Sequence, residues 1–234
     1  SRGLGDVYKR QTYELGNYTA SLLKYDDSLQ NLTIPKSIEY EGCEFAVTNI
    51  DNRAFAGCEN LTDITIPDSV TSIGESAFED CTSLTNITIP NSLEIIGDYL
   101  FSGCTCLTSV VIPDSVTNIG GHAFSGCTNL VNVMIGNNVT SIGEHAFYNC
   151  RSLTNLTIGN KVTIIENYAF YGCISLKDIT IPDSVTSIGE SAFDSCTSLV
   201  SVTLPKSIIT IGTYAFSGCT SLTSIIIPDL SLIH

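Results

Sequence analysis

The sequence predicts a repeat solenoid, a stack of short coils with a parallel β-sheet along one face. The stretch DITIPDSVTSIGESAF occurs twice without change, at Asp63–Phe78 and Asp178–Phe193, and the copies lie 115 residues apart, which is five times 23. A shift of 23 residues also aligns eight cysteines: Cys58, Cys81, Cys104, Cys127, Cys150, Cys173, Cys196 and Cys219. A fixed short period of this kind indicates stacked structural repeats in one elongated domain.

The two ends of the chain do not follow the period. Residues 1–11 (SRGLGDVYKRQ) share nothing with the repeat, and residues 230–234 (LSLIH) break it. Both stretches resemble translated adapter sequence, so we expect a non-native leader over 1–11 and a non-native tail over 230–234. The predicted domain is then a single solenoid over 12–229.

Two hairpins are predicted near the N-terminus. Residues 12–28 place apolar side chains around Gly16-Asn17, which is typical of a hairpin that caps the first coil. The first period is nine residues too long, and the extra residues fall in 38–47, where Glu41-Gly42 favours a second hairpin turn. Because we expect this insertion to project from the stack, Glu41 and Phe45 are candidate partner contacts.

Each regular unit begins with a short strand. Ile64 and Ile66 alternate with Asp63 and Thr65, so the isoleucines are expected to face inward and the polar residues solvent. Pro67 cannot donate a ladder hydrogen bond and therefore ends the strand. The chain then reverses direction, and the apolar pair Val70 and Ile73 follows on the returning segment. Ala77 and Phe78 are expected to fill the side of the coil opposite the strand.

Phenylalanine and glycine recur in fixed columns. Eight phenylalanines, from Phe55 to Phe216, are expected to form a buried spine. The residue before each column cysteine is Gly, Asn or Asp, which tolerate left-handed backbone, with Ser195 as the one exception. Glycines after the second apolar pair suggest a positive φ as well, but Asp51 and Glu166 share that column, so no strict requirement is expected.

The unit CENLTDITIPDSVTSIGESAFED (Cys58–Asp80) resembles the repeat of BspA-type leucine-rich repeat proteins, and the resemblance covers residues 29–229. It implies a right-handed superhelix of the leucine-rich-repeat, α/β horseshoe class, here mostly β with short turns or 3₁₀ segments. It also implies an extracellular or cell-surface protein, bacterial in origin, with a role in adhesion or protein binding. No cofactor and no catalytic residue are implied.

Charge and hydropathy exclude several partner classes. The chain has 24 acidic and 10 basic residues and a net charge of −14, which argues against nucleic acid because such affinity rests on Lys and Arg. The apolar residues lie in short runs, well below the roughly 18 that a spanning helix needs, so no membrane insertion is expected.

Cysteine and histidine are residues of this chain that could act as metal ligands. The column cysteines recur once per coil without the paired spacing of zinc sites, so we expect buried thiols, with Cys43 and Cys106 as the reactive ones. His122 and His145 stand in one column and could approach each other, but no third ligand is evident. No catalytic motif is present, so an enzyme is not expected.

Candidate contacts lie where the unit is varied. The outer strand face is polar, and Val111 and Met134 interrupt it as neighbours, where a partner's apolar anchor could sit. The column before Ala-Phe carries a second set of larger side chains: Tyr99, His122, His145 and Tyr168.

Three functions remain open from the sequence. The first is a non-catalytic protein-binding or adhesion module for a host or microbial surface or matrix protein. The alternatives are a structural spacer that displays another domain, and a glycan-binding module. The outer strand face lacks the exposed aromatic side chains that glycan-binding sites normally use. The last coil has no polar cap, so self-association through the C-terminal end is also expected.

Overall fold

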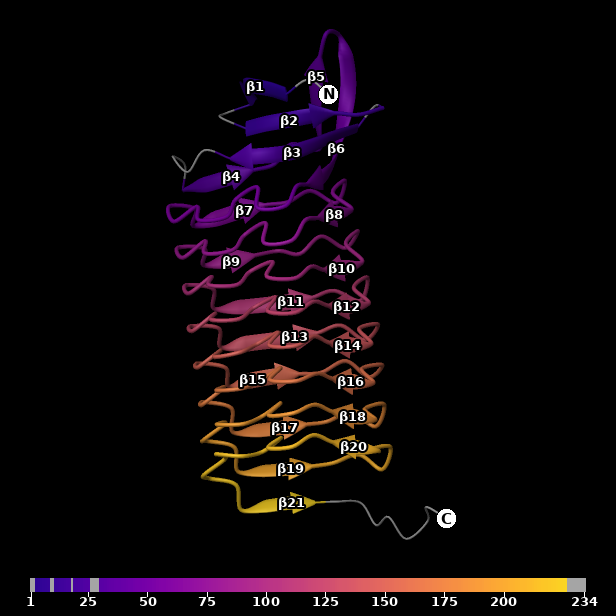
Figure 1. Cartoon of the computed structure of the whole chain (residues 1–234). Helices are drawn as coiled ribbons and strands as arrows, with labels where there is room; N and C mark the ends of the chain where they lie inside the picture. Colours follow the sequence, from indigo (N-terminus) through magenta and orange to yellow (C-terminus); the bar gives the residue numbers. More distant parts are fainter. Residues whose placement is uncertain (1–2, 9–10, 18, 26–29, 227–234) are drawn as a thin grey trace.

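The computed structural model describes residues 3–8, 11–17, 19–25 and 30–226, and in these ranges the chain forms strands and turns without a helix. Figure 1 shows the coils stacked along one axis, with a cap of strands at the N-terminal end. The solenoid predicted from the 23-residue period is confirmed. The predicted tail at 230–234 lies outside the described residues.

One parallel ladder follows the predicted repeat strands. Within each sheet of this ladder, neighbouring regular strands are 23 residues apart, so Val111 lies beside Met134 and Ile112 beside Ile135. The first strand, Asn31–Thr33, pairs with a strand 32 residues later because of the insertion. The ladder is divided into three sheets of three strands. Its members are β4 (Asn31–Thr33), β7 (Asp63–Thr65), β9 (Asn86–Ile87), β11 (Ser109–Ile112), β13 (Asn132–Ile135), β15 (Asn155–Thr157), β17 (Asp178–Thr180), β19 (Ser201–Thr203) and β21 (Ser224–Ile226).

A second parallel ladder runs along the stack, where the sequence had indicated only a returning apolar pair. Its strands have two residues each, and six of them form one continuous sheet. The fixed period explains it, because each two-residue segment lies level with its copies in the neighbouring coils and can pair with both. The strands are β8 (Ser72–Ile73), which pairs with the cap, and β10 (Ile95–Ile96), β12 (Asn118–Ile119), β14 (Ser141–Ile142), β16 (Ile164–Ile165), β18 (Ser187–Ile188) and β20 (Thr210–Ile211).

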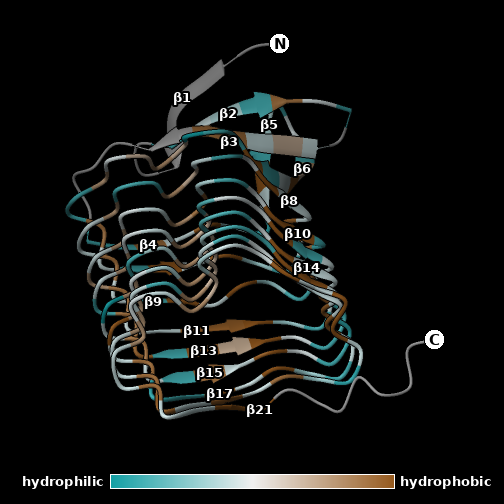
Figure 2. Ribbon diagram, turned by 60° about the horizontal axis from the view of Figure 1, so that its bottom comes forward, coloured by the Kyte–Doolittle hydropathy of each residue, from teal (hydrophilic) through white to brown (hydrophobic). Residues whose placement is uncertain are grey.

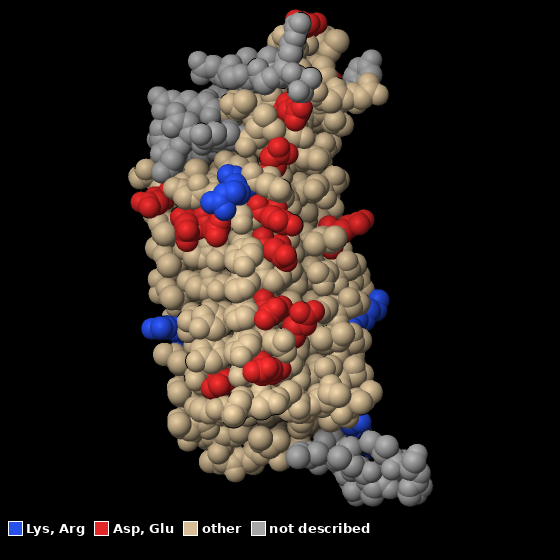
Figure 3. All heavy atoms as spheres, viewed as in Figure 1, with Lys and Arg blue, Asp and Glu red and all other residues tan. Residues whose placement is uncertain are grey.

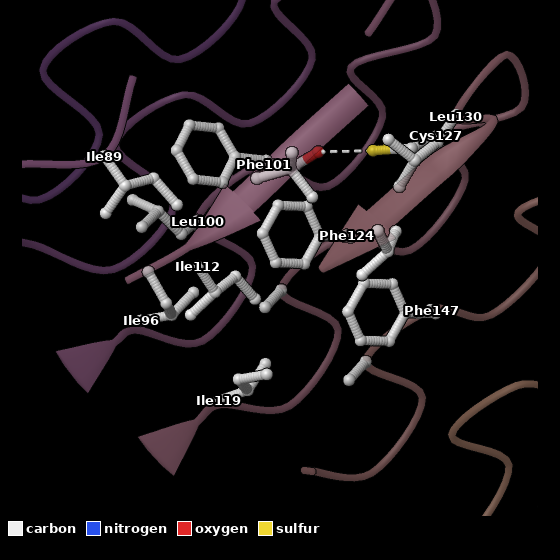
Figure 4. Close-up of a cluster of buried hydrophobic side chains, with 14 of the residues drawn as sticks. Ile89, Ile96, Leu100, Phe101, Ile112, Ile119, Phe124, Cys127, Leu130 and Phe147 are labelled. Atoms are coloured by element: carbon white, nitrogen blue, oxygen red, sulfur yellow. Dashed lines mark hydrogen bonds between the residues drawn. The ribbon is translucent and has the colours of Figure 1, made fainter. Parts of the chain in front are cut away.

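The interior is a set of side-chain columns. Figure 2 shows that hydrophobic segments recur at corresponding places in neighbouring coils. The phenylalanines from Phe55 to Phe216 stack with ring centroids 4.9–5.4 Å apart, which confirms the predicted spine. Column cysteines from Cys81 onward donate from Sγ to the carbonyl of the phenylalanine 26 residues earlier, at 3.1–3.4 Å. Figure 4 shows one such bond, from Cys127 to Phe101, beside the stacked rings.

Burial sets the chemistry of these thiols. It raises the pKa of Cys127 and of Cys173 to about 12, so both remain neutral at ordinary pH. Cys43 is exposed and Cys106 half-buried, so both are more accessible than the fully buried column thiols, and their reactivity stays a prediction.

The glycines divide into two kinds. The residue before each column cysteine has φ between 57° and 73°, so the left-handed requirement is confirmed, Ser195 included. The glycine after the second strand has no positive φ, which agrees with the expectation that no strict requirement applies in that column. At Gly143 an added Cβ would lie 2.7 Å from Ile119 O, so glycine is needed for the close approach of two backbones.

The N-terminal end is a cap sheet. β2 (Gln11–Leu15) and β3 (Thr19–Tyr25) form the predicted antiparallel hairpin, and β5 (Ser37–Tyr40) and β6 (Cys43–Ile50) form the second one around Glu41-Gly42. Both turn residues have positive φ, as a two-residue hairpin loop requires. β6 then pairs in parallel with β3 and with β8, which joins the cap to the second ladder. Residues Gly3–Tyr8, expected to lie outside the fold, form β1 and pair with β2.

Candidate functional site

The outer face of the first ladder carries one exposed apolar pair. Val111 on β11 and Met134 on β13 are directly paired neighbours with 58% and 53% of their surface exposed. Both alternate with buried residues along their strands, so the period of two that buries Ile112 and Ile135 points this pair to solvent.

A hollow of about 480 Å³ lies at the end of these strands. Val111, Met134 and Thr157 line it from the sheet, and Gly136 and Gly159 line it where other coils carry the strand-ending proline. An added Cβ at Gly159 would lie 2.1 Å from Gly136 O, so glycine is also what lets these coils approach closely here. The apolar pair therefore lies beside a shallow depression, a form suited to receiving an apolar side chain of another protein.

Apart from Ile226 on the last strand, the rest of this face is polar and carries bonds between successive coils. Asn155 Nδ2 donates to Asn132 Oδ1 at 2.6 Å, and at the following turn Asn137 N donates to Asp114 Oδ1 at 2.6 Å. Such bonds between successive coils hold the polar side chains in fixed rows, so the surface around the apolar pair is preorganised.

The second candidate set forms a stacked column of rings on another part of the coil. Tyr99, His122, His145 and Tyr168 follow one another with centroids 4.6, 4.5 and 4.8 Å apart and planes within 12° of parallel. All have φ of 55° or 56°. Left-handed backbone is uncommon for side chains of this size, and here every coil repeats it, so it belongs to the geometry of the turn.

Stacking decides whether the two histidines can share a metal. The planes of His122 and His145 differ by 5° and their centroids are 4.5 Å apart, so the ring lone pairs lie in two parallel planes and do not converge on one ion. Among the described residues no group of three or more His, Cys, Asp or Glu side chains is placed to hold a metal. The arrangement is that of a ring stack.

Burial and neighbouring charges set the electrostatics of His145. Burial is the main cause that lowers its pKa, the positive charge of His122 acts in the same direction, and Glu144 opposes both. Its Nδ1 lies 3.6 Å from Glu144 Oε1 and has no hydrogen-bond partner. The neutral form of the imidazole is therefore favoured within the stack.

The C-terminal end of the stack has a carboxylate partner. Tyr168 Oη donates to Glu190 Oε1 at 3.1 Å, and this bond is the first cause that raises the pKa of the tyrosine. The phenol is thus held in its protonated form beside a negative charge.

The predicted hairpin contacts are not brought together. Glu41 is exposed at the tip of the β5–β6 hairpin, whereas Phe45 is half-buried and packs against the core opposite Ile38. Glu41 alone of the two is presented as an outward contact.

Two further tyrosines, which no sequence prediction singled out, join the ring cluster. Tyr148 and Tyr171 stack at 5.0 Å as a second, shorter file, and they tilt against His145 and Tyr168 at 5.2 and 6.0 Å. The signal was available, because Tyr148 and Tyr171 are 23 residues apart and lie three residues after members of the first column.

Acidic side chains gather along the length of one face, with basic side chains few on it (Figure 3). One ion pair is formed by Arg53, whose Nη1 lies 2.6 Å from Glu79 Oε2. In the part of the chain that the structure describes, no helix has the length and apolar character to cross a bilayer.

Comparison with known proteins places these features in a family. The chain matches the family model described as BspA type leucine rich repeat region, in six copies over residues 18–154 and 140–233. A search of curated proteins found no match.

Several solved structures are similar. One is a leucine-rich cell surface protein of Faecalibacterium prausnitzii, with 30% identity and a TM-score of 0.69 over 97% of this chain and 76% of that one. A leucine-rich repeat protein of T. pallidum has 27% identity and a TM-score of 0.67 over 97% and 92%. One of Bacteroides ovatus has 27% identity and a TM-score of 0.65 over 94% and 70%.

Proposed function

Because the chain belongs to the BspA-type leucine-rich repeat family, we propose that it is a non-catalytic protein-binding or adhesion module of a bacterial cell-surface or secreted protein. The observation that carries the proposal is the exposed Val111–Met134 pair beside its hollow, in the middle of a strand face that is otherwise mostly polar. The ligand is a host or microbial surface or matrix protein.

The chemistry of the face supports a protein ligand. Protein interfaces take most of their binding energy from a few apolar or aromatic anchors surrounded by polar contacts that exclude water. Val111 and Met134 supply the anchor region, and the bonded Asn side chains and the outward Thr side chains supply the surrounding polar contacts. Methionine suits such a site because its flexible thioether adapts to the shape of a partner.

The location of the relatives supports the cellular setting. The similar protein of Faecalibacterium prausnitzii is described as a cell surface protein, and we carry that location over to this chain as part of the proposal.

The test uses the chain's own pattern to design variants. The double variant Val111→Thr/Met134→Thr restores the residue that most coils carry in this column, so the fold is expected to persist. The matched control Ile95→Thr/Ile164→Thr removes two exposed apolar side chains from the second ladder instead.

Immobilised wild-type protein and both variants are incubated with purified matrix and bacterial surface proteins, and bound proteins are identified and titrated. The proposal predicts at least about tenfold weaker binding for the Val111→Thr/Met134→Thr variant and unchanged binding for the control. Equal binding by both variants, or no specific binding by the wild type, would refute the assignment to this face.

A further inference from the structure

The ring column is interrupted once, and the interruption leaves a slot. After Tyr168 the column continues with Ser191 and then Tyr214, so a small side chain stands where a ring would extend the stack. Ser191 is 4% exposed and Tyr214 is 66% exposed, which places the serine at the floor and leaves the second tyrosine uncovered.

The width of the slot follows from the stack. Neighbouring rings in the column are 4.5–4.8 Å apart, so Tyr168 and Tyr214, which are two coils apart, are separated by about 9–10 Å. His145 fills a space of this width between His122 and Tyr168. A planar group of similar thickness therefore fits between the two tyrosines.

Carboxylates border the slot. Glu190 directly precedes Ser191 and accepts the Tyr168 hydroxyl bond at 3.1 Å, and Asp194 follows three residues after Ser191. From Ser76 to Tyr214 the column itself contains no Lys or Arg. The slot therefore has two aromatic faces with negatively charged side chains beside them, an environment that favours binding of a planar cation.

The chain itself shows how such a cation is accommodated. Arg53 occupies the same column, and its guanidinium reaches the next coil to pair with Glu79 at 2.6 Å. The two serines have matching surroundings. Glu79 lies three residues after Ser76, and Asp194 lies three residues after Ser191. Both serines are buried, and each is followed in the column by a tyrosine. The position beside Ser76 therefore receives the guanidinium of Arg53, whereas no arginine directly precedes Ser191 in the column to fill the equivalent position.

We propose that the Tyr168–Ser191–Tyr214 slot binds an arginine side chain of a partner protein, with Glu190 and Asp194 as its counter-ions. Arginine is favoured over lysine because a guanidinium is planar, stacks on aromatic faces and pairs with carboxylates in a fixed fork. The slot lies on a different part of the coil from Val111 and Met134. The inference rests on the proposed function only in taking the ligand to be a protein side chain.

The test is a nuclear magnetic resonance titration of the labelled protein with the capped tripeptide Gly-Arg-Gly. The expected result is saturable shifts of the signals of Ser191 and its neighbours. Binding should be about tenfold weaker for the citrulline tripeptide, which is planar but neutral, and weaker also for the lysine tripeptide.

Variants locate the site. Ser191→Tyr fills the slot with the residue type of its neighbours and should abolish the shifts, whereas Ser76→Tyr, the same change at the other serine of the column, should leave them intact. Glu190→Gln/Asp194→Asn tests the charge without filling the slot and should weaken binding about tenfold.

Several results would overturn the inference: no saturable shift with the arginine tripeptide, equal binding of the citrulline tripeptide, or unchanged binding by Ser191→Tyr with a native spectrum. The Val111→Thr/Met134→Thr variant leaves the slot unchanged, so its arginine binding should equal that of the wild type. Protein capture by this variant tests the strand face, and the arginine titration tests the slot, so either proposal can fail without the other.

Discussion

Left-handed backbone occurs at two residues of every regular coil, and the two positions are filled differently. The position before the column cysteine is glycine in most coils, whereas the position before Ala-Phe carries Arg, Ser, Tyr or His with φ between 50° and 60°. Side chains are therefore kept at the second position although glycine would adopt that backbone more easily. The ring column and its slot are built on that second position.

Ser195 is the serine at the glycine-rich position, with φ of 60°. Replacement by glycine removes the left-handed penalty of a side chain and loses only the half-buried bond from Ser195 Oγ to Asp194, so Ser195→Gly should raise the free energy of unfolding by about 0.5–1 kcal/mol. Urea denaturation measures it. Ser195→Val serves as the comparison and should destabilise, because a β-branched side chain tolerates this backbone poorly; a more stable valine variant would contradict the explanation.

At the scale of the element, the glycine after a second strand permits close packing of the coils at some positions and is not required for it at others. An added Cβ at Gly143 would meet backbone atoms of the preceding coil at 2.7–2.8 Å, whereas at Gly97 the nearest atoms would lie at 3.8 Å. Neither glycine has a positive φ. A difference between their alanine variants would therefore arise from the contact of the added Cβ and not from a strained backbone.

Gly143→Ala should therefore lower the free energy of unfolding by about 1–3 kcal/mol, and Gly97→Ala should leave it within about 0.5 kcal/mol of the wild type. Chemical denaturation of the two variants side by side checks this. Equal losses at both positions would indicate that backbone approach is not what selects glycine.

The phenylalanine spine is the largest apolar element. Phe124 is fully buried between Phe101 and Phe147, so Phe124→Ala should cost about 3–5 kcal/mol, of which part is the cavity left in the stack. Phe216 is half-buried, and its alanine variant should cost less. A thermal midpoint of Phe124→Ala equal to that of the wild type would disprove the spine.

The molecule as a whole is expected to be sensitive to alkaline pH. An unfolded thiol releases its proton near pH 9, whereas burial raises the pKa of Cys127 and Cys173 to about 12, so between these values the folded state holds more protons. Rising pH then favours the unfolded chain, and each such thiol contributes a loss of about 1.4 kcal/mol per pH unit.

Urea denaturation across about pH 8 to pH 11 measures the effect, and the stability should fall steeply above about pH 9. Cys127→Ala should reduce the slope. Cys43→Ala, which removes an exposed thiol, should leave it unchanged. A slope that is the same in Cys127→Ala as in the wild type would show that column thiols are not its source.

The repeat made most of the fold predictable. Column membership alone assigned Ile64 and Phe124 to the interior and Val111 and Met134 to the surface, because one period places every copy in the same environment. The sequence could not show that Gly143 is selected by backbone approach or that two-residue segments pair as a second sheet, since both depend on the distance between coils. The slot at Ser191 needed the ring spacing as well as the column.

Binding through the strand face is tested most directly by cross-linking. A photoreactive amino acid is placed at position 134 and, as the control, at position 180, an exposed position of the same column two coils away. The protein is then irradiated with the partner recovered by capture. We predict a cross-linked product from position 134 and little or none from position 180. Cross-linking from position 180 alone, or equally from both positions, would contradict the assignment of binding to the Val111–Met134 pair.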